Sequence, residues 1–301
     1  MHSAAFALPL LLSLFLGPAS PVRAQGFEQV EIETLSVAPG VYMLTGRGGN
    51  IGVSVGVDGV FLIDDQFAPL TPKIQAAVTA LSTQPIRFLL NTHWHGDHTG
   101  GNENLGRAGV VIVAHDNVRT RMSIAQFSKS TGRRTPASPP QALPVVTFND
   151  QVTFHLNGLE VHAFHVEAAH TDGDAIVHFR NANVIHMGDT YFNGRYPFID
   201  RASGGSVEGT ILAVEQVLAL INADTRVIPG HGPLSDRAQL VAYRDMLVSV
   251  RDRVRAAIDA GQTLEQLLAA RPTRDFDAKW GGSFVRPESF VRTLYQDLSS
   301  D

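Results

Sequence analysis

Short apolar runs separated by turn residues fill the first part of the chain. They are rich in Val and Ile and predict strands, and Asp58-Gly59 is a strong hairpin signal between two of them. The run 86–90 is continuously apolar, which is typical of a strand buried on both faces. Predicted strands lie at 30–35, 41–44, 51–57, 60–63, 86–90 and 110–114, and predicted helices lie at 71–81 and 116–127.

The same order, strands followed by helices, returns in the second part of the chain. The polar, proline-rich stretch 128–144 separates the two parts and predicts an exposed loop. Two β-plus-α halves, over about 30–127 and 145–259, predict layered sheets with outer helices. In the second part, predicted strands lie at 145–148, 152–156, 159–165, 175–179, 183–186 and 226–228, and predicted helices at 207–221, 236–259, 264–270 and 287–298.

The N-terminal residues have the pattern of a targeting segment. An apolar run over 4–16 is followed by Gly17-Pro18 and then by Val22-Arg23-Ala24, which predicts a signal peptide, residues 1–24, and a periplasmic or secreted protein. The run is shorter than the ~20 apolar residues of a transmembrane helix, so we expect no stable membrane anchor. Residues 25–301 are expected to form a single domain with a C-terminal helical tail from about residue 260.

The composition is that of a globular protein. Of 301 residues, 44% are hydrophobic and 18% charged, and the formal net charge is −5. This mild acidity gives no basic face for nucleic acid, so we expect a small-molecule substrate and no nucleic-acid partner. The chain has no Cys, which excludes thiol nucleophiles, thiolate metal sites and disulfides. Any metal chemistry must therefore use His and carboxylate ligands.

The stretch that follows the run 86–90 concentrates chemically active side chains. It reads N-T-H-W-H-G-D-H from position 91 to 98. Side chains at i and i+2 of extended backbone point the same way, so His93 and His95 can converge on one ion. Gly96 allows a bend that aims Asp97 and His98 at a second ion. Four other apolar runs also lead to a His or Asp near their carboxyl ends, where sites collect in α/β proteins. These residues are Asp64, His170, Asp189 and His231.

The motif at 93–98, with His170, Asp189 and His231 in order, resembles the metallo-β-lactamase superfamily over about residues 30–235. The resemblance implies an α+β fold, a four-layer αββα sandwich with the metals at one edge between the sheets. It also implies a role for each residue. The first ion would be held by His93, His95 and His170, and the second by Asp97, His98 and His231, with Asp189 bridging both and Asp64 orienting the ligand loop.

Nitrogen and carboxylate ligands suit Zn²⁺, and we expect two ions per chain, although Fe or Mn fits the same ligands. Two ions ~3.5–4 Å apart lower the pKa of a shared water toward ~7. We therefore expect an exported di-zinc metallo-hydrolase that uses a metal-bound hydroxide on a carbonyl substrate, namely a β-lactam, lactone or ester. Asp97 is the candidate catalytic residue because it can steer the hydroxide and pass its proton to the leaving group.

Other functions of the same residues stay open. They are thioester or phosphoester hydrolysis, an iron-dependent sulfur dioxygenase, and a non-catalytic, metal-carrying accessory protein of a periplasmic system. A bridging Asp is typical of the glyoxalase II-like and lactonase-like members of the family. Gly48-Gly49-Asn50 predicts a hairpin turn or, alternatively, a flap over the site. The candidate substrate contacts are Trp94, Tyr191, Phe192, Asn193 and Arg195.

Overall fold

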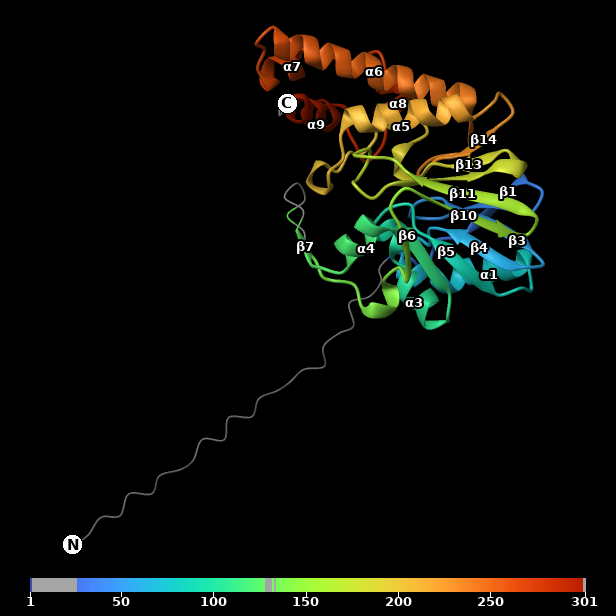
Figure 1. Ribbon diagram of the computed structural model, residues 1–301. Helices are drawn as coiled ribbons and strands as arrows, with labels where there is room; N and C mark the ends of the chain where they lie inside the picture. The colour runs from blue at the N-terminus through green and yellow to red at the C-terminus, as the bar shows by residue number, and fades with distance from the viewer. Residues whose placement is uncertain (2–25, 128–131, 133, 300–301) are drawn as a thin grey trace.

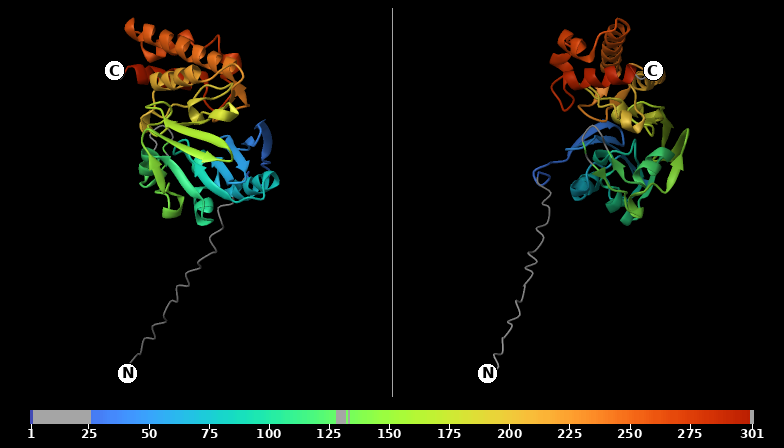
Figure 2. Two further views of the ribbon diagram at one scale, coloured as in Figure 1. Left: turned by 45° about the vertical axis from the view of Figure 1, so that its right-hand side comes forward. Right: turned by 90° about the vertical axis from the view of Figure 1, so that its left-hand side faces the viewer.

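Two β-sheets pack face to face, and helices cover the outer face of each sheet (Figure 1). The computed structural model describes Met1 and residues 26–127, 132 and 134–299. The two further views show the same succession of helices, sheet, sheet and helices (Figure 2). The predicted four-layer αββα sandwich is confirmed.

The first sheet holds seven strands in the order β1-β2-β3-β4-β5-β6-β9. β1 to β4 pair antiparallel, whereas β4, β5, β6 and β9 are parallel, so the carboxyl ends of these last four strands meet at one edge. The strands are β1 (Glu33–Ala38), β2 (Val41–Thr45), β3 (Ile51–Gly56), β4 (Gly59–Ile63), β5 (Ile86–Leu90), β6 (Val111–His115) and β9 (Val146–Phe148).

Helices α1 (Thr71–Leu81) and α3 (Asn102–Arg107) cover the outer face of this sheet, and α4 (Asp116–Met122) follows β6. Pro72 stands in the first turn of α1, where it has no backbone N–H to leave unpaired. Ile74 and Val78 are one helical turn apart and pack on Leu62 and Leu89 of the sheet. This spacing explains why the sequence pattern identifies the helix.

The second sheet holds six strands in the order β10-β11-β12-β13-β14-β15. β13 and β14 are parallel, and the other pairs are antiparallel. The strands are β10 (Gln151–Leu156), β11 (Leu159–His165), β12 (Ala175–Phe179), β13 (Val184–His186), β14 (Arg226–Ile228) and β15 (Ser235–Asp236). A separate two-stranded pair is formed by β7 (Gln126–Phe127) and β8 (Arg134–Thr135).

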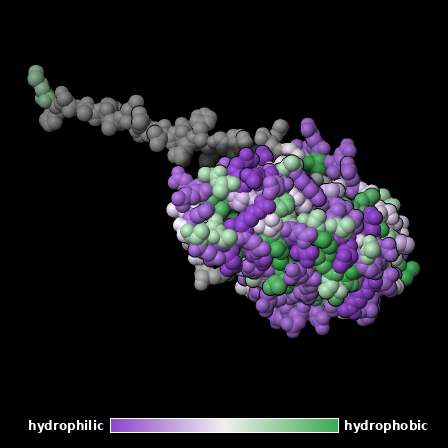
Figure 3. All heavy atoms as spheres, turned by 90° about the horizontal axis from the view of Figure 1, so that it is seen from above, coloured by the Kyte–Doolittle hydropathy of each residue, from purple (hydrophilic) through white to green (hydrophobic). Residues whose placement is uncertain are grey.

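The helices of the second half cover this sheet on its outer side. They are α5 (Val207–Leu220), α6 (Arg237–Asp259), α7 (Leu264–Ala270), α8 (Asp277–Trp280) and α9 (Pro287–Leu298). α7 and α9 coincide with the predicted tail helices, and α9 buries Phe290 and Leu294 in the same core as α5 and α6. Seen from above, this layer shows mostly hydrophilic residues around smaller hydrophobic groups (Figure 3).

The core between the two sheets is mostly apolar. Met43, Phe61 and Leu90 of the first sheet pack against Val161 and Val177 of the second, each no more than 2% exposed. Full burial of such a side chain contributes about 1.5–3 kcal/mol. This packing holds the facing edges of the two sheets in a fixed relation, and the strand ends at these edges carry the candidate site.

Three predictions need comment. The helix predicted over 116–127 ends at Met122, because the N–H of Ser123 closes the last turn on the carbonyl of Arg119 and residues 126–127 pair with β8. The predicted signal peptide, residues 1–24, lies outside the described residues except for Met1. Within the described residues, no helix is long and apolar enough to span a membrane.

Candidate metal centre

The loop after β5 brings four potential ligands to the sheet edge. His93 and His95 precede a single helical turn, α2 (Gly96–Thr99), which carries Asp97 and His98. A Cβ on Gly96 would meet no atom within 4 Å, and Gly96 does not have a positive φ. An ordinary helical turn thus redirects the chain here, and it does not depend on the conformational freedom of Gly96.

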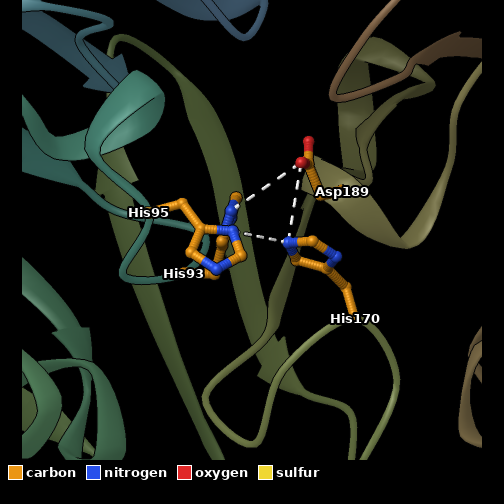
Figure 4. Close-up of side chains that lie close together, drawn as sticks. All are labelled: His93, His95, His170 and Asp189. Atoms are coloured by element: carbon orange, nitrogen blue, oxygen red, sulfur yellow. Dashed lines mark hydrogen bonds and ion pairs between the residues drawn. The ribbon is translucent and has the colours of Figure 1, made fainter. Parts of the chain in front are cut away.

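One group of side chains joins both halves of the sandwich (Figure 4). His93, His95, His170 and Asp189 each offer a ligand atom, and these atoms all lie within 4.8 Å of one another. His95 Nδ1 lies 2.8 Å from His170 Nε2. Asp189 Oδ2 lies 3.8 Å from His93 Nε2 and 3.6 Å from His170 Nε2.

A second group lies on the other side of Asp189. Asp97, His98 and His231 gather their ligand atoms within the same limit. Nε2 of His231 lies 3.3 Å from Nε2 of His98 and from Oδ2 of Asp97. Asp189 turns its other oxygen, Oδ1, to this group, 3.1 Å from His98 Nε2 and 3.4 Å from His231 Nε2. One carboxylate therefore directs one oxygen to each group, the arrangement that a bridging ligand requires.

Hydrogen bonds on the outer ring nitrogens fix how four of the imidazoles are oriented. Each donates its outer N–H to an oxygen, which leaves the inner nitrogen as a lone pair facing the cluster. The acceptors are Thr92 Oγ1 for His93 at 3.0 Å, Asp200 Oδ2 for His95 at 3.0 Å, Asp64 Oδ2 for His98 at 2.7 Å and the Phe198 carbonyl for His170 at 2.6 Å.

This arrangement fits a pair of cations. Two facing lone pairs 2.8 Å apart, on His95 and His170, repel each other unless a cation lies against both. His93 Nε2 is buried and has no hydrogen-bond partner among the described residues. With a Zn–N bond of about 2.0–2.1 Å, tetrahedral ligand atoms stand ~3.3 Å apart, close to the separations in both groups. The donor set of imidazole nitrogens and carboxylates suits zinc, and iron or manganese as well.

The two groups differ in charge. Burial lowers the pKa of His93, and it lowers the pKa of His170 to about 4, so both rings are neutral at pH 7. Burial also disfavours charge on His231, but Asp189 and Asp97 outweigh it and raise the pKa to about 9. For Asp97 the signs are opposite: burial raises its pKa, but His98 and His231 outweigh burial and lower the pKa to about 2.

Asp64 holds the loop that carries the ligands in place through hydrogen bonds, as the family resemblance implies. It is fully buried and, besides His98, accepts hydrogen bonds from the N–H of Thr92 at 2.8 Å and from Thr92 Oγ1 at 2.7 Å. Thr92 Oγ1 in turn accepts from His93. One carboxylate thus orients one ligand of each group.

Asp174 and Asp200 are further supports that the sequence reasoning missed. Asp174 accepts from the N–H groups of His170 and Thr171 and from Thr171 Oγ1, which fixes the loop that carries His170. Asp200 holds His95, 105 positions earlier in the chain. The stretch A-H-T-D-G-D at 169–174 is a signal for the first, but no local pattern connects Asp200 with its partner.

The segment Gly48–Asn50 is a fixed connection between β2 and β3. Gly49 N–H donates to the carbonyl of Asp97 at 3.0 Å, and Asn50 N–H donates to that of Gly230 at 2.7 Å. Asn50 Nδ2 also donates to the carbonyls of Pro229 and Gly232. A Cβ at Gly49 would lie 2.1 Å from the ring of His98, so only glycine permits this approach. The predicted turn between β2 and β3 is present, and the flap stays a prediction.

A cavity of about 840 Å³ opens over the cluster. Trp94, Phe192 and Arg195 line it, as expected of substrate contacts. Tyr191 and Asn193 do not, which corrects their prediction as contacts. Phe192 forms an isolated bridge with His231, so its two neighbours point to the opposite side, Tyr191 to Ser235 Oγ and Asn193 to the Pro233 carbonyl.

Comparisons with known proteins agree with this geometry. The family model of the metallo-beta-lactamase superfamily matches residues 44–232. A metallo-beta-lactamase type 2 of Bacillus cereus is 23% identical over 190 residues, 63% of this chain and 69% of the relative. A hydroxyacylglutathione hydrolase of Nitrosococcus oceani is 26% identical over 147 residues, 48% of each chain. The solved metallo-beta-lactamase from Pontibacter korlensis has a TM-score of 0.60 and 20% identity, covering 72% of this chain and 99% of that one.

Proposed function

The chain belongs to the metallo-beta-lactamase superfamily, and we propose that it is an exported di-zinc hydrolase acting on a β-lactam, lactone or ester. The observation that carries the proposal is the pair of ligand groups around Asp189, which has one carboxylate oxygen directed to each. The ligand atoms gathered in two separate groups support two cations rather than one. Members of this superfamily are mostly hydrolases, and both named relatives carry hydrolase names.

The candidate residues have two roles, metal binding and proton transfer. His93, His95 and His170 would hold one ion, and Asp97, His98 and His231 the other. Bound at these positions, two divalent ions supply Lewis acidity to the substrate carbonyl and acidify water. Asp97 lies at the cavity, and its lowered pKa keeps it ionised at neutral pH. Its ionised oxygens can orient the attacking water by hydrogen bonding, and we propose that a proton passes through Asp97 to the leaving group.

Metal analysis and a substrate panel test the proposal together. We expect about two zinc ions per chain and hydrolysis that a chelator abolishes, measured on a chromogenic cephalosporin, lactones, esters, thioesters and phosphodiesters. His93→Ala should lose metal and activity together, while the exposed His155→Ala on β10 should keep both. Normal hydrolysis by metal-free His93→Ala protein would contradict the proposal.

Thioester hydrolysis is the second candidate. The relative from Nitrosococcus oceani is named a hydroxyacylglutathione hydrolase, and this chain spans about half of its length. The same panel distinguishes the two candidates, since turnover confined to thioesters favours the second.

Export is part of the same proposal and has its own test. The N-terminal pattern supports cleavage after Ala24. Protein recovered from the periplasm or the medium should begin at Gln25. Full-length protein confined to the cytosol would exclude export.

A further inference from the structure

One apolar wall of the cavity begins at the metal-ligand cluster and continues to the protein surface. The ring of Phe198 lies 6.0 Å from that of His95 and 5.9 Å from that of His170. Phe198 also lies 6.2 Å from the ring of Phe284, which is 81% exposed. Aromatic rings therefore lead without a break from two candidate ligands to solvent.

A second apolar wall begins at the same histidine. The ring of Trp94 lies 4.9 Å from that of His95 and packs on the cluster that contains Met122. Beyond Met122, Ile124 lines the cavity and is 58% exposed. Arg121, in the same stretch, is held by two hydrogen bonds of 2.6 Å to Asp172. Its charge is thus already neutralised, and this wall offers apolar contact.

Large apolar side chains that are exposed to solvent at the rim of a cavity are stabilised when a ligand covers them. Each exposed apolar Å² that a ligand covers is worth about 25 cal/mol. The side chains lie on separate segments, residues 122–127 and 283–285, yet line one cavity. Its volume lies within the ~300–1,000 Å³ of sites for drug-sized ligands. The two walls both start at His95, which makes them continuous with the site of reaction.

We propose that these walls bind an apolar arm of the substrate, so that the preferred substrate is a carbonyl compound bearing an extended hydrocarbon chain. The reacting carbonyl lies at the ligand cluster, and the chain runs past Phe198 toward Phe284 and Ile124. The inference rests on the proposed hydrolase function for the position of the carbonyl. Binding of the chain itself requires no turnover, which allows the two ideas to be tested separately.

Chain-length selectivity of the zinc-loaded enzyme is the kinetic test. With 4-nitrophenyl esters from acetate to octanoate, below their micelle concentrations, we expect kcat/KM to rise about threefold per methylene, just under the ~fourfold of full burial. In Phe284→Ala and in Ile124→Ala, the ratio of kcat/KM for the octanoate ester to kcat/KM for the acetate ester should fall about fivefold. One side of the acyl chain then no longer contacts the protein. Leu212→Ala, which removes an apolar side chain about as exposed as Ile124 from α5 outside the cavity, is the matched control and should keep the ratio.

The second test measures binding without turnover. Calorimetry with octanoate and butyrate should show tighter binding of octanoate to the zinc-loaded protein, and Phe284→Ala should reduce that difference. This result would support the apolar site even if no ester of any length were hydrolysed, an outcome that would count against the hydrolase proposal alone.

Three results would overturn the inference. The first is ester hydrolysis with a flat dependence on chain length, which leaves the hydrolase function intact. The second is an equal loss of selectivity in Leu212→Ala, which indicates non-specific adsorption. The third is a change of sedimentation coefficient in Phe284→Ala without a change of selectivity, which makes the rim an interface between copies of the chain.

Discussion

Carboxylates determine which nitrogen faces inward in two of the imidazoles, Asp200 for His95 and Asp64 for His98. Asp64 accepts three hydrogen bonds, two from Thr92 and one from His98. Its backbone φ is +63°, a left-handed conformation that Asp and Asn tolerate better than most residues. A change to Asn therefore alters charge and hydrogen bonding without new backbone strain.

Asp64→Asn is expected to weaken zinc binding by about 10–100-fold, the usual loss when a residue supporting a metal ligand is changed. The physical reason is that a neutral amide makes His98 a poorer donor of its lone pair. Competition with a chromogenic chelator measures the affinity. Asp65→Asn is the matched control: Asp65 is equally buried and its side chain accepts from the N–H of Gly101, while its hydrogen bond to a candidate ligand, His98, runs from the backbone N–H and is kept in the variant. Equal affinities for Asp64→Asn and wild type would disprove the role.

Away from the site, His115 should make stability depend on pH. It is 5% exposed and its ring stacks on His165 at 3.9 Å. Burial, followed by the charge of His165, lowers the pKa of His115 below 6.5. A base with a depressed pKa favours the folded state above the pKa of the unfolded chain, and this stability is lost as the pH falls through the folded pKa.

Unfolding free energy should therefore fall below pH 6.5, with a slope from this residue of at most about 1.4 kcal/mol per pH unit. His115→Asn removes the titrating ring but keeps an N-cap acceptor for the N–H of Asn117, which His115 Nδ1 now provides. Denaturant unfolding between pH 8 and pH 5 should give a shallower slope for this variant. An unchanged slope would assign the pH dependence to other groups.

The sequence predicts the residues that bind directly better than those that support them. His170, Asp189 and His231 can be found because each follows an apolar run that ends at the sheet edge. Asp200 and Asn50 cannot be found in this way, because their partners are 105 and 179 positions away in the chain. Tyr191 shows the opposite error: nearness to a ligand in sequence does not tell which side of the backbone faces the cavity.

At the scale of elements, long amphipathic helices are predictable and short connections are not. α6, α7 and α9 match their predicted ranges within one residue because their apolar spacing alone identifies them. The predicted helix over 116–127 fails in its last turn, where pairing of β7 with β8 overrides the local pattern. Tertiary contacts decide such short segments, and a single sequence window does not contain them.

Helix α9 supports the segment that carries Phe198 and Asp200. The ring of Phe290 stacks on Tyr196 at 4.7 Å, and Asp297 accepts hydrogen bonds from Arg201 and from the first N–H of α5. Phe290→Ala should lower the free energy of unfolding by about 3–5 kcal/mol, since Phe290 is fully buried. Denaturant unfolding measures this loss. Leu212→Ala, at an exposed position on α5, should stay within about 0.5 kcal/mol of wild type. A small loss for Phe290→Ala would mean that α9 packs loosely.

At the scale of the whole molecule, the cluster joins the two halves of the sandwich. His93, His95, Asp97 and His98 belong to the first half, and His170, Asp189 and His231 to the second. Hydrogen bonds between the halves also lie at this edge, among them those of Asn50 to Pro229 and of His95 to Asp200. Metal binding is therefore coupled to folding of the entire domain, because the unfolded chain presents no assembled site.

Removal of metal should accordingly lower the melting temperature of the full domain. Ligand linkage gives about 2.7 kcal/mol when free zinc is 100 times its dissociation constant, and this corresponds to a fall of at least ~5 °C for a chain of this size. Calorimetric scans of chelated and zinc-loaded protein measure the difference. Zinc should restore the loss, whereas excess Mg²⁺ should not, because Mg²⁺ prefers oxygen ligands and five of the seven candidate ligands are imidazoles. Identical melting curves with and without zinc would show that metal binding adds nothing to the contacts that hold the two halves together.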